Sequence, residues 1–446
     1  MRHLHRTAPS FLVITGRRRV GKTELIKEFM RGKRALYYYV DANKSIEVLM
    51  REFGQYTAET LDLPPYIRID TPGVLLEFLF LQKESLIVVF DEFQRFLKIY
   101  PAMITELQRF WDMRGKDSHL FLIVSGSSVG MIKKIFIGGE APLNKRSDTI
   151  MTLQPFRYQQ ILQVQRGLGI KNREDQLDLY HLFGGTIYYY PLIEKFNCKN
   201  LDDALDRLVL NDFAPLRREV SDVLIEESGR EYATYHEIIA ALAEGKSTQK
   251  AIADHTHVAA TSLSPYLDDL INLLGIVEYR VPITGAASRS KMGRYFLKDN
   301  FFRFYGRFIY RNMSLYQSGR YDTLKQKILS EWRAFSGRAF EDMVRELLIR
   351  ELSGEYARLG SWWNRRGDEI DLLALGKSGS LAVEIKNSDL TRGEAISVLC
   401  ELERKIRLVQ KVSAPISIGV AARHIEGKAL LRDEGYFAWD LRDAGI

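Results

Sequence analysis

The hydrophobic and polar positions change their period along the chain, and this change predicts where strands and helices alternate. Near the N-terminus, "FLVIT" (residues 11–15) is a continuous apolar run, whereas "TELIKEFM" (residues 23–30) repeats its apolar residues at helical spacing. "SLIVVF" (residues 85–90) and "HLFLIV" (residues 119–124) have the length of buried strands. Buried strands that alternate with helices predict an α/β domain built on a parallel sheet.

From about residue 226 the pattern changes to short helices. Three helical segments, at residues 235–245, 247–256 and 261–275, are expected here, the last with Pro265 in its first turn. Residues 276–284 and 294–299 then predict a two-stranded hairpin. Three helices followed by a hairpin predict a winged helix.

The charges of this middle segment indicate whether it binds DNA or a protein. The third helix carries Asp268 and Asp269 and no lysine or arginine over residues 259–274, which disfavours readout of a DNA groove. The basic residues of the hairpin suit phosphate contacts at best. They are Arg280, Arg289, Lys291, Arg294 and Lys298. We favour the alternative, a rigid spacer or a contact for a protein partner.

The C-terminal part has a mixed pattern. The polar stretch at residues 316–327 precedes an amphipathic helix over residues 334–352. "GDEIDLLALGKSGSLAVEIKN" (residues 367–387) predicts a β-hairpin that turns at "GKSGS". A helix over residues 393–411 and a strand over residues 415–421 follow, and together they predict a small α/β domain.

Composition sets the class of protein. A chain of 446 residues, with 46% hydrophobic and 27% charged residues, is expected to form two to four globular domains. Its formal net charge of +7 permits a nucleotide or nucleic-acid partner without requiring one. Two cysteines without a CxxC pair argue against a thiolate metal site and for a reducing cytoplasm. With no long apolar run, we expect a soluble protein that does not bind a membrane.

"GRRRVGKT" fits the phosphate-binding loop pattern in full, because four residues separate Gly16 from Gly21-Lys22-Thr23. The loop lies between a predicted strand and a predicted helix, where free backbone N–H groups can cradle the phosphates of ATP. Lys22 would reach the β- and γ-phosphates, and Thr23 would ligate Mg²⁺. The arginines occupy free positions of the pattern and are not expected to be the primary phosphate ligands. The predicted nucleotide-binding segment comprises Gly16, Arg17, Arg18, Arg19, Val20, Gly21, Lys22, Thr23 and Glu24.

An acidic pair follows the second buried strand, as in a Walker B motif. Asp91 would hold Mg²⁺ through its water shell, and Glu92 would polarise the attacking water, which favours a hydrolase over a passive binder. Ser125 lies at the tip of the next strand, where it could orient the water or contact the γ-phosphate. A helix N-cap is the alternative for this serine, and the sequence leaves both open.

These segments, together with "IVSGSSVGMI" and "APLNKRSDTIMTLQPF", resemble the archaeal-type ATPases, which are P-loop proteins related to the AAA+ and STAND classes. The resemblance implies that Arg146, after "APL", senses the γ-phosphate or acts as an arginine finger, in cis or in trans; a surface arginine is the equally weighted alternative. "HLFGGTIYYYPLI" resembles the family's lid turn, where Gly184 and Gly185 let the backbone approach closely. Only fifteen residues precede Gly16, fewer than is usual in the family, so base specificity stays open.

The C-terminal hairpin resembles the active site of PD-(D/E)XK nucleases, because twelve residues separate Asp371 from Glu384-Ile385-Lys386. The resemblance implies that Asp371 and Glu384 hold one or two Mg²⁺ ions and that Lys386 stabilises the developing charge or orients the water. Glu341, on the preceding helix, would complete the metal site. A surface hairpin with scattered charges, or a degenerate binding role, remains the alternative.

The sequence thus predicts an α/β protein made of a P-loop ATPase core (residues 1–160), a helical lid (161–225), a winged helix (226–312) and a small domain resembling restriction endonucleases (329–446). The predicted function is an ATP-binding and ATP-hydrolysing switch that controls a DNA-directed nuclease-like effector. The alternative is a signalling or scaffold ATPase whose C-terminal domain only binds DNA or a protein. A homo-oligomer is left open.

Overall fold

The computed structural model describes residues 1–6, 9–228, 232–285, 292–410 and 412–445. The chain forms two compact units, which are treated separately here. Unit 1 comprises Met1–Pro155, Thr186–Tyr188 and Leu267–Ile276, and unit 2 comprises Phe156–Gly185, Tyr189–Tyr266 and Val277–Ile446.

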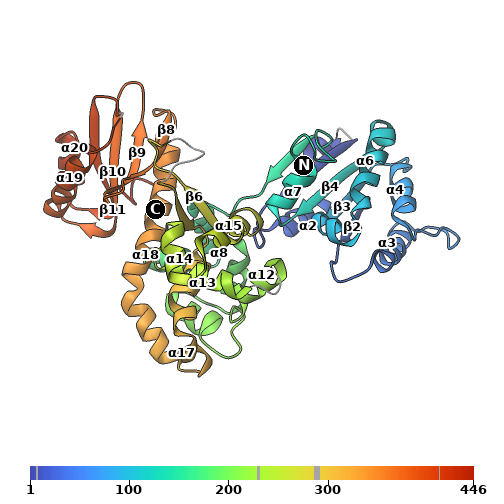
Figure 1. Ribbon diagram of the computed structural model, residues 1–446, viewed down its shortest axis with the longest axis horizontal. Coiled ribbons are helices and arrows are strands. Elements are labelled where there is room, and N and C mark those ends of the chain that lie inside the picture. Colours follow the sequence, from blue (N-terminus) through green and yellow to red (C-terminus); the bar gives the residue numbers. More distant parts are fainter. Residues whose placement is uncertain (7–8, 229–231, 286–291, 411, 446) are drawn as a thin grey trace. The chain divides into compact units, whose positions relative to one another are not determined.

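Unit 1 is built on a five-stranded, fully parallel sheet (Figure 1). The strand order is β2-β3-β4-β1-β5, so β4 lies between the strand that precedes the P-loop and the strand that ends in Asp91. The strands are β1 (Ser10–Thr15), β2 (Ala35–Tyr39), β3 (Leu86–Asp91), β4 (Leu120–Gly126) and β5 (Thr149–Thr152). Because parallel strands share one carboxyl edge, their C-terminal residues gather there.

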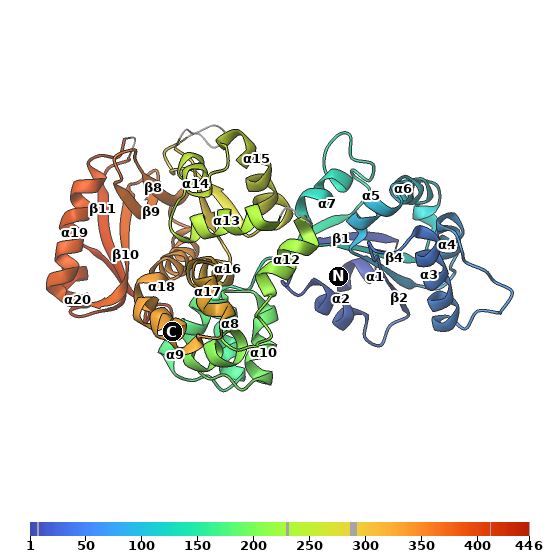
Figure 2. The same cartoon turned by 60° about the horizontal axis from the view of Figure 1, so that its bottom comes forward.

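Both faces of this sheet are buried, which explains why its strands are continuous apolar runs. On β1, Phe11 and Val13 face one hydrophobic core, and Leu12 and Ile14 face the other. The first core is covered by α3 (Ile46–Thr60), α4 (Pro72–Phe80), α5 (Phe96–Ile99), α6 (Ala102–Arg114) and α7 (Val129–Phe136), some of which Figure 2 shows beside the sheet. The second is covered by α1 (Arg2–Arg6) and α2 (Lys22–Met30).

Unit 2 begins with a group of helices. They are α8 (Tyr158–Gly167), α9 (Arg173–Phe183), α10 (Tyr190–Lys195), α11 (Leu201–Ala204) and α12 (Glu219–Ser228). Gly184 and Gly185 follow α9, and a Cβ on Gly185 would lie 1.8 Å from the carbonyl oxygen of Phe156. The backbone therefore does approach closely at this Gly-Gly turn, as the sequence predicted.

Three helices and a hairpin follow where the pattern places them. They are α13 (Tyr232–Ala243), α14 (Gln249–Thr256), α15 (Ala260–Asp268), β6 (Val277–Arg280) and the antiparallel β7 (Arg294–Leu297). Pro265 lies inside α15 rather than in its first turn, because the helix begins at Ala260. Arg289 and Lys291, two of the basic residues expected on the hairpin, lie outside the described residues.

The helix before the C-terminal domain is longer than the pattern predicted. After α16 (Asn300–Phe304) and α17 (Met313–Gln317), α18 runs without interruption over Tyr321–Leu352. The proposed domain boundary at residue 329 therefore lies inside a helix. The reason is packing. Leu324, Ile328 and Trp332 are buried at helical spacing, and they extend the apolar face of the helix into residues 316–327, which the sequence pattern had suggested to be a polar connection.

The C-terminal sheet is mixed, with strand order β12-β11-β10-β9-β8 (Figure 1). β8 (Arg358–Trp363), β9 (Glu369–Leu375) and β10 (Ser380–Leu390) are antiparallel neighbours, whereas β11 (Ile416–Ile425) and β12 (Phe437–Asp440) continue parallel to β10. The helices α19 (Arg392–Ile406) and α20 (Lys428–Asp433) pack on it through apolar side chains. The predicted hairpin is thus the β9–β10 pair.

The protein is an α/β protein with a parallel P-loop sheet and a C-terminal mixed-sheet domain, as its sequence predicted. None of the helices within the described ranges combines the length and the apolar character needed to cross a membrane.

Candidate functional site

The P-loop follows β1 and depends on two glycines with positive φ. Gly16 has φ of 153°, and a Cβ there would lie 2.4 Å from the carbonyl oxygen of Leu153. Gly21, directly before α2, has φ of 92°. Both are conformations that side chains rarely adopt, so the loop needs glycine at each position to turn its backbone N–H groups toward a ligand.

Lys22 and Thr23 begin α2 directly after the loop. The Lys22 ammonium is buried and donates hydrogen bonds to the carbonyl oxygens of Gly16, at 2.7 Å, and Arg17, at 3.1 Å. Its charge is therefore held against the loop backbone, where a phosphate would replace the carbonyls as its partner.

Thr23 and Asp91 meet at the carboxyl edge of the sheet. Thr23 Oγ1 donates a hydrogen bond of 3.0 Å to Asp91 Oδ2, which also accepts one from the Tyr37 hydroxyl. Burial, and then the charge of Asp91, raise the pKa of Tyr37 above its usual range, so Tyr37 remains a donor. A hydroxyl next to a carboxylate is the donor set expected for Mg²⁺ beside a nucleotide, and these two residues fit such an ion.

Glu92 follows Asp91 in a left-handed conformation, with φ of 57°. Its Oε2 accepts hydrogen bonds from Gln94 Nε2 and, at 2.8 Å, from Ser127 Oγ. The carboxylate of the predicted water-polarising residue is therefore oriented by the tip of β4. Neither Gln94 nor Ser127 was among the predicted site residues.

Ser125, near the end of β4, and the two serines that follow the strand differ in what they contact. The hydroxyl of Ser125 is buried and has no hydrogen-bond partner among the described residues. Ser128 caps α7 by accepting a hydrogen bond from Met131 N at 3.2 Å, so the N-cap alternative raised for Ser125 is filled by Ser128. Ser127 is the serine that touches Glu92.

The other residues of the predicted segment contact protein groups. Arg17 donates to the Thr186 hydroxyl, and the Arg19 guanidinium lies 3.7 Å from the centroid of the Tyr188 ring. Val20 is buried, and Glu24 pairs with Lys27 on the surface of α2. Arg18 is half-buried, at a position that the motif leaves free.

Arg146 lies in a bidentate ion pair within unit 1. Its Nε and Nη2 donate to the two carboxylate oxygens of Asp112 at 2.7 and 2.8 Å, and Nη1 donates to the Pro142 carbonyl oxygen at 2.9 Å. The hydrogen bond to Arg146 lowers the pKa of Asp112. In this conformation the guanidinium ties the "APL" segment to α6.

The second predicted site lies on β9 and β10. Asp371 Oδ2 accepts the backbone N–H of Ile385 at 2.8 Å. Glu384 Oε1 accepts hydrogen bonds from Lys386 and from Lys405 of α19, each at 3.0 Å, whereas its buried Oε2 has no partner within the described part of the chain. Asp371 and Glu384 are each less than a tenth exposed.

The charges of this site interact. Burial, followed by the charges of Glu384 and Glu341, raises the pKa of Asp371 to about 7. Burial also raises the pKa of Glu341, although Arg338 opposes the shift. Burial lowers the pKa of Lys386, but Glu384, Asp371 and Glu341 outweigh it and raise the pKa above its usual range. Asp371, Glu384, Lys386 and Glu341 therefore share one electrostatic environment.

The predicted metal set is not assembled as a cluster. Among the described residues, no three His, Cys, Asp or Glu side chains lie close enough together to hold a metal ion. The unpartnered Glu384 Oε2 and the raised pKa of Asp371 fit a cation, while the two lysines on Glu384 already supply positive charge.

Residues 1–192 match a family model described as an ATPase domain found predominantly in Archaea. The chain carries an archaeal-type ATPase domain. Residues 305–398 match a second model, described as archaeal and bacterial proteins of unknown function. An uncharacterized protein of Methanocaldococcus jannaschii is 29% identical over 425 residues, which cover 94% of this chain and 92% of the relative.

Solved structures show more distant similarities. A Walker-type ATPase of Pyrococcus abyssi has 16% sequence identity and a TM-score of 0.48, over 66% of this chain and 90% of that one. The Aeropyrum pernix ORC2 protein has 16% identity and a TM-score of 0.42, over 69% of this chain and 89% of its own. The match to the family model, rather than these likenesses, supports the ATPase domain.

Three residues of the sites were missed by the sequence analysis. In the ATPase domain, Gln94 follows the acidic pair within "DEFQ", and Ser127 was one of three serines in or directly after β4 without a distinguishing mark. Lys405 lies 21 residues beyond Glu384 on another element, and no spacing rule relates the two. Of the three, only Gln94 lies close in sequence to a predicted site residue, three positions after Asp91.

Proposed function

We propose that the protein is an ATP-binding and ATP-hydrolysing switch. The observation that carries this proposal is the hydrogen bond of 3.0 Å between Thr23 and Asp91, because it joins the end of the P-loop to the acidic end of β3. The match of residues 1–192 to an ATPase domain supports it independently. A P-loop and a neighbouring acidic strand end are the two parts that Mg²⁺-ATP requires.

Each residue has a role in this proposal. Lys22 exchanges its two carbonyl partners for the β- and γ-phosphates, and Thr23 and Asp91 hold Mg²⁺, directly and through water. Glu92, oriented by Ser127, accepts a proton from the attacking water or aligns it. Ser125 and Arg146 remain candidates for contacts with the γ-phosphate.

The test uses the full-length protein with ATP and Mg²⁺. Lys22→Ala is expected to lose nucleotide binding in calorimetry, because it removes the ammonium group that is proposed to contact the β- and γ-phosphates. Glu92→Gln is expected to bind ATP with the affinity of the wild type while phosphate release stops. Wild-type turnover in Glu92→Gln would show that another group activates the water.

We further propose that the nucleotide state controls a nucleic-acid-directed C-terminal effector. The support is the shared environment of Asp371, Glu384 and Lys386 on the β9–β10 hairpin, with α18 before it and α19 after it. A divalent cation would neutralise the two carboxylates, and Lys386 would stabilise charge that develops on a scissile phosphate. Glu341 would support the cation from α18.

The middle segment is proposed to be a winged helix, with the preceding helices as a lid of the ATPase domain. Two basic residues of its hairpin are engaged inside the protein: Arg280 pairs with Asp342 at 3.1 Å, and Arg294 pairs with Glu369 at 3.1 Å. Lys298 is exposed. Because these arginines are already paired, the segment is better suited to act as a spacer or to contact a protein than to bind DNA. The protein that it contacts could be a second copy of this chain, which would give a homo-oligomer.

A second candidate function is a scaffold ATPase without nuclease activity. The observation that favours it is the pair of lysines on one oxygen of Glu384, since Lys386 and Lys405 both lie 3.0 Å away. Two ammonium groups can replace a metal ion as the neutralising charge. In that case the C-terminal domain binds a partner or DNA and cleaves nothing.

Metal binding and cleavage decide between the two. Full-length Lys22→Ala protein, which lacks a competent nucleotide site, is titrated with Mn²⁺, and cleavage of single- and double-stranded DNA is followed in parallel. The nuclease-like effector predicts metal uptake and cleavage, both lost in Asp371→Asn but retained in Asp389→Asn, an exposed acid on the neighbouring strand β10. Neither uptake nor cleavage, with or without ATP in the wild type, would support the scaffold.

A further inference from the structure

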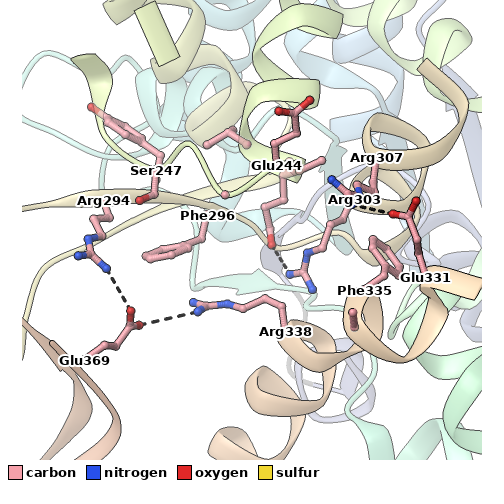
Figure 3. A pocket seen from close by; sticks show the side chains of 16 residues that line it. Glu244, Ser247, Arg294, Phe296, Arg303, Arg307, Glu331, Phe335, Arg338 and Glu369 are labelled. Atoms are coloured by element: carbon pink, nitrogen blue, oxygen red, sulfur yellow. Dashed lines mark hydrogen bonds and ion pairs between the residues drawn. The ribbon is translucent and has the colours of Figure 1, made fainter. Parts of the chain in front are cut away.

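A pocket of about 600 Å³ in unit 2 has charged side chains as seven of its 16 lining residues and was not among the predicted sites. It lies between the end of α13, strand β7 and helix α18 (Figure 3). Four arginines and three glutamates line it. The arginines are Arg294, Arg303, Arg307 and Arg338, and the glutamates are Glu244, Glu331 and Glu369.

The arginines nearer the rim have carboxylate partners. Arg307 pairs with Glu331 at 2.7 Å, and Arg294 pairs with Glu369 at 3.1 Å. Arg338 lies 3.9 Å from Glu369, and Figure 3 shows Glu369 between Arg294 and Arg338. These side chains are between a fifth and just over a third exposed, so a solute can reach them.

Arg303 is different because it is buried and incompletely bonded. It is 7% exposed, and its Nη2 donates to the Leu297 carbonyl oxygen at 2.7 Å and to Asp342 at 3.2 Å. Its Nη1 is buried and has no partner among the described residues. An unpaired guanidinium N–H in a protein interior is costly, so this group is a ready donor for a ligand.

The surroundings of Arg303 do not supply the missing acceptor. Asp342 is shared with Arg280, at 3.1 Å, and with Arg345, at 2.7 Å. Burial lowers the pKa of Arg303, and the charges of Arg338 and Arg280 lower it further, against the pull of Asp342. Arg280, Arg303 and Arg345 share the carboxylate of Asp342, and the pocket lining, with four arginines and three glutamates, carries an excess of positive charge.

We propose that this pocket binds a small phosphorylated molecule of about nucleoside monophosphate size, with its phosphate on Arg303. The volume lies within the range of small-ligand pockets. The planar guanidinium matches the oxygens of a phosphate, and a dianion can also take Arg338 or Arg294 from Glu369. A metal cation is disfavoured by the same excess of positive charge.

Recognition is expected to rest on the phosphate rather than on a stacked base. The Phe296 ring already has the guanidinium groups of Arg280, at 5.0 Å, and Arg338, at 4.5 Å, near its centroid. Phe335 packs against Phe308, with centroids 5.0 Å apart. Neither ring offers an unoccupied platform of the kind that base stacking needs, so inorganic phosphate is the minimal probe.

The test is calorimetric titration of full-length Lys22→Ala protein, whose P-loop no longer competes, with AMP and with inorganic phosphate at constant ionic strength. Ala334 lines the pocket at an exposed position of α18, so Ala334→Glu places a negative charge at the wall without disturbing the core. Gln326→Glu adds the same charge at an exposed position of the same helix outside the lining. Both changes are made in the Lys22→Ala background.

We expect saturable binding with a stoichiometry of one. Ala334→Glu should weaken it by about tenfold or more, as the loss of one phosphate–arginine contact does, and Gln326→Glu should leave it unchanged. Arg303→Lys, with its folding checked by circular dichroism, should also weaken it. The proposal is overturned if neither probe binds saturably at millimolar concentrations, or if Ala334→Glu binds like Gln326→Glu. Because the P-loop is already disabled, this result is independent of ATP hydrolysis.

Discussion

Ser127 Oγ donates a hydrogen bond of 2.8 Å to Glu92 Oε2, although 35 residues separate them in the chain. The contact exists because β4 is the neighbour of β3, so that the residues after both strands meet at one edge of the sheet. It fixes the carboxylate that is proposed to polarise the attacking water. Ser127 therefore acts as a positioning residue for Glu92 in this proposal.

Removing this hydroxyl is expected to slow the chemical step more than binding. In Ser127→Ala, we expect kcat for ATP hydrolysis to fall by about 10- to 100-fold, because a misaligned base loses much of its effect, while the Kd for ATP stays near that of the wild type. Steady-state phosphate release and calorimetry measure the two. Ser85→Ala, at an exposed position before β3, is the control; equal losses in both variants would refute the special role of Ser127.

A methyl group on Gly16 should damage the P-loop. Gly16→Ala adds a positive-φ penalty of about 1 kcal/mol, and its Cβ would lie 2.4 Å from the Leu153 carbonyl oxygen, which must move. We expect a lower Tm and loss of nucleotide binding. Gly32→Ala separates the two causes, because Gly32 also has positive φ, of 70°, but nothing lies within 4 Å of its Cβ position. If both variants lose the same stability, the close approach to Leu153 contributes nothing.

The Arg146–Asp112 pair distinguishes a structural arginine from a phosphate sensor. Because both side chains are partly exposed, the pair is expected to contribute about 1 kcal/mol or less. If its role is structural, Arg146→Ala and Asp112→Asn lower the free energy of unfolding in urea by similar amounts and leave ATP turnover unchanged. We expect this outcome from the geometry. A loss of turnover in Arg146→Ala alone would instead support the γ-phosphate role, and mixing it with a Glu92→Gln protein would test whether it acts in trans.

Asp371 makes stability depend on pH. Its pKa of about 7 in the folded protein exceeds its ordinary value of 3.8, because burial and the charges of Glu384 and Glu341 disfavour ionisation. The folded state therefore keeps a proton that the unfolded state loses, and the resulting stability is fully present below about pH 4 and lost as the pH rises through about 7. The loss is of the order of 4 kcal/mol at most.

Asp371→Asn should remove this dependence. In buffer with a chelator, we expect the variant to be more stable than the wild type at pH 8 and to show a flatter profile between pH 4 and 7 in urea titrations. Asp389→Asn, at an exposed position of the neighbouring strand β10, should behave like the wild type. Addition of Mn²⁺ at pH 8 should stabilise the wild type and not Asp371→Asn if a cation binds there. A steep wild-type slope retained in Asp371→Asn would assign the titration to another group.

The sequence by itself determined the features that depend on short spacings. The Gly16 to Thr23 spacing, the apolar run that ends in Asp91-Glu92, and the turn between β9 and β10 are each written in a few neighbouring residues. Local backbone geometry dictates such features, so the ATPase domain and the α/β class could be predicted. The start of α18 was misplaced because the burial of Leu324 and Ile328 depends on what packs against them.

Only the tertiary structure decided which side chains meet across elements. Strand order brings Ser127 to Glu92, the packing of α19 brings Lys405 to Glu384, and the meeting of β7 with α16 and α18 leaves Arg303 buried with an unpaired N–H. Such contacts join residues far apart in the chain, and no period or motif encodes their distance. Desolvation acts in the same way, since the pKa of Asp371 is set by burial and by charges on two other elements rather than by its own neighbours in sequence.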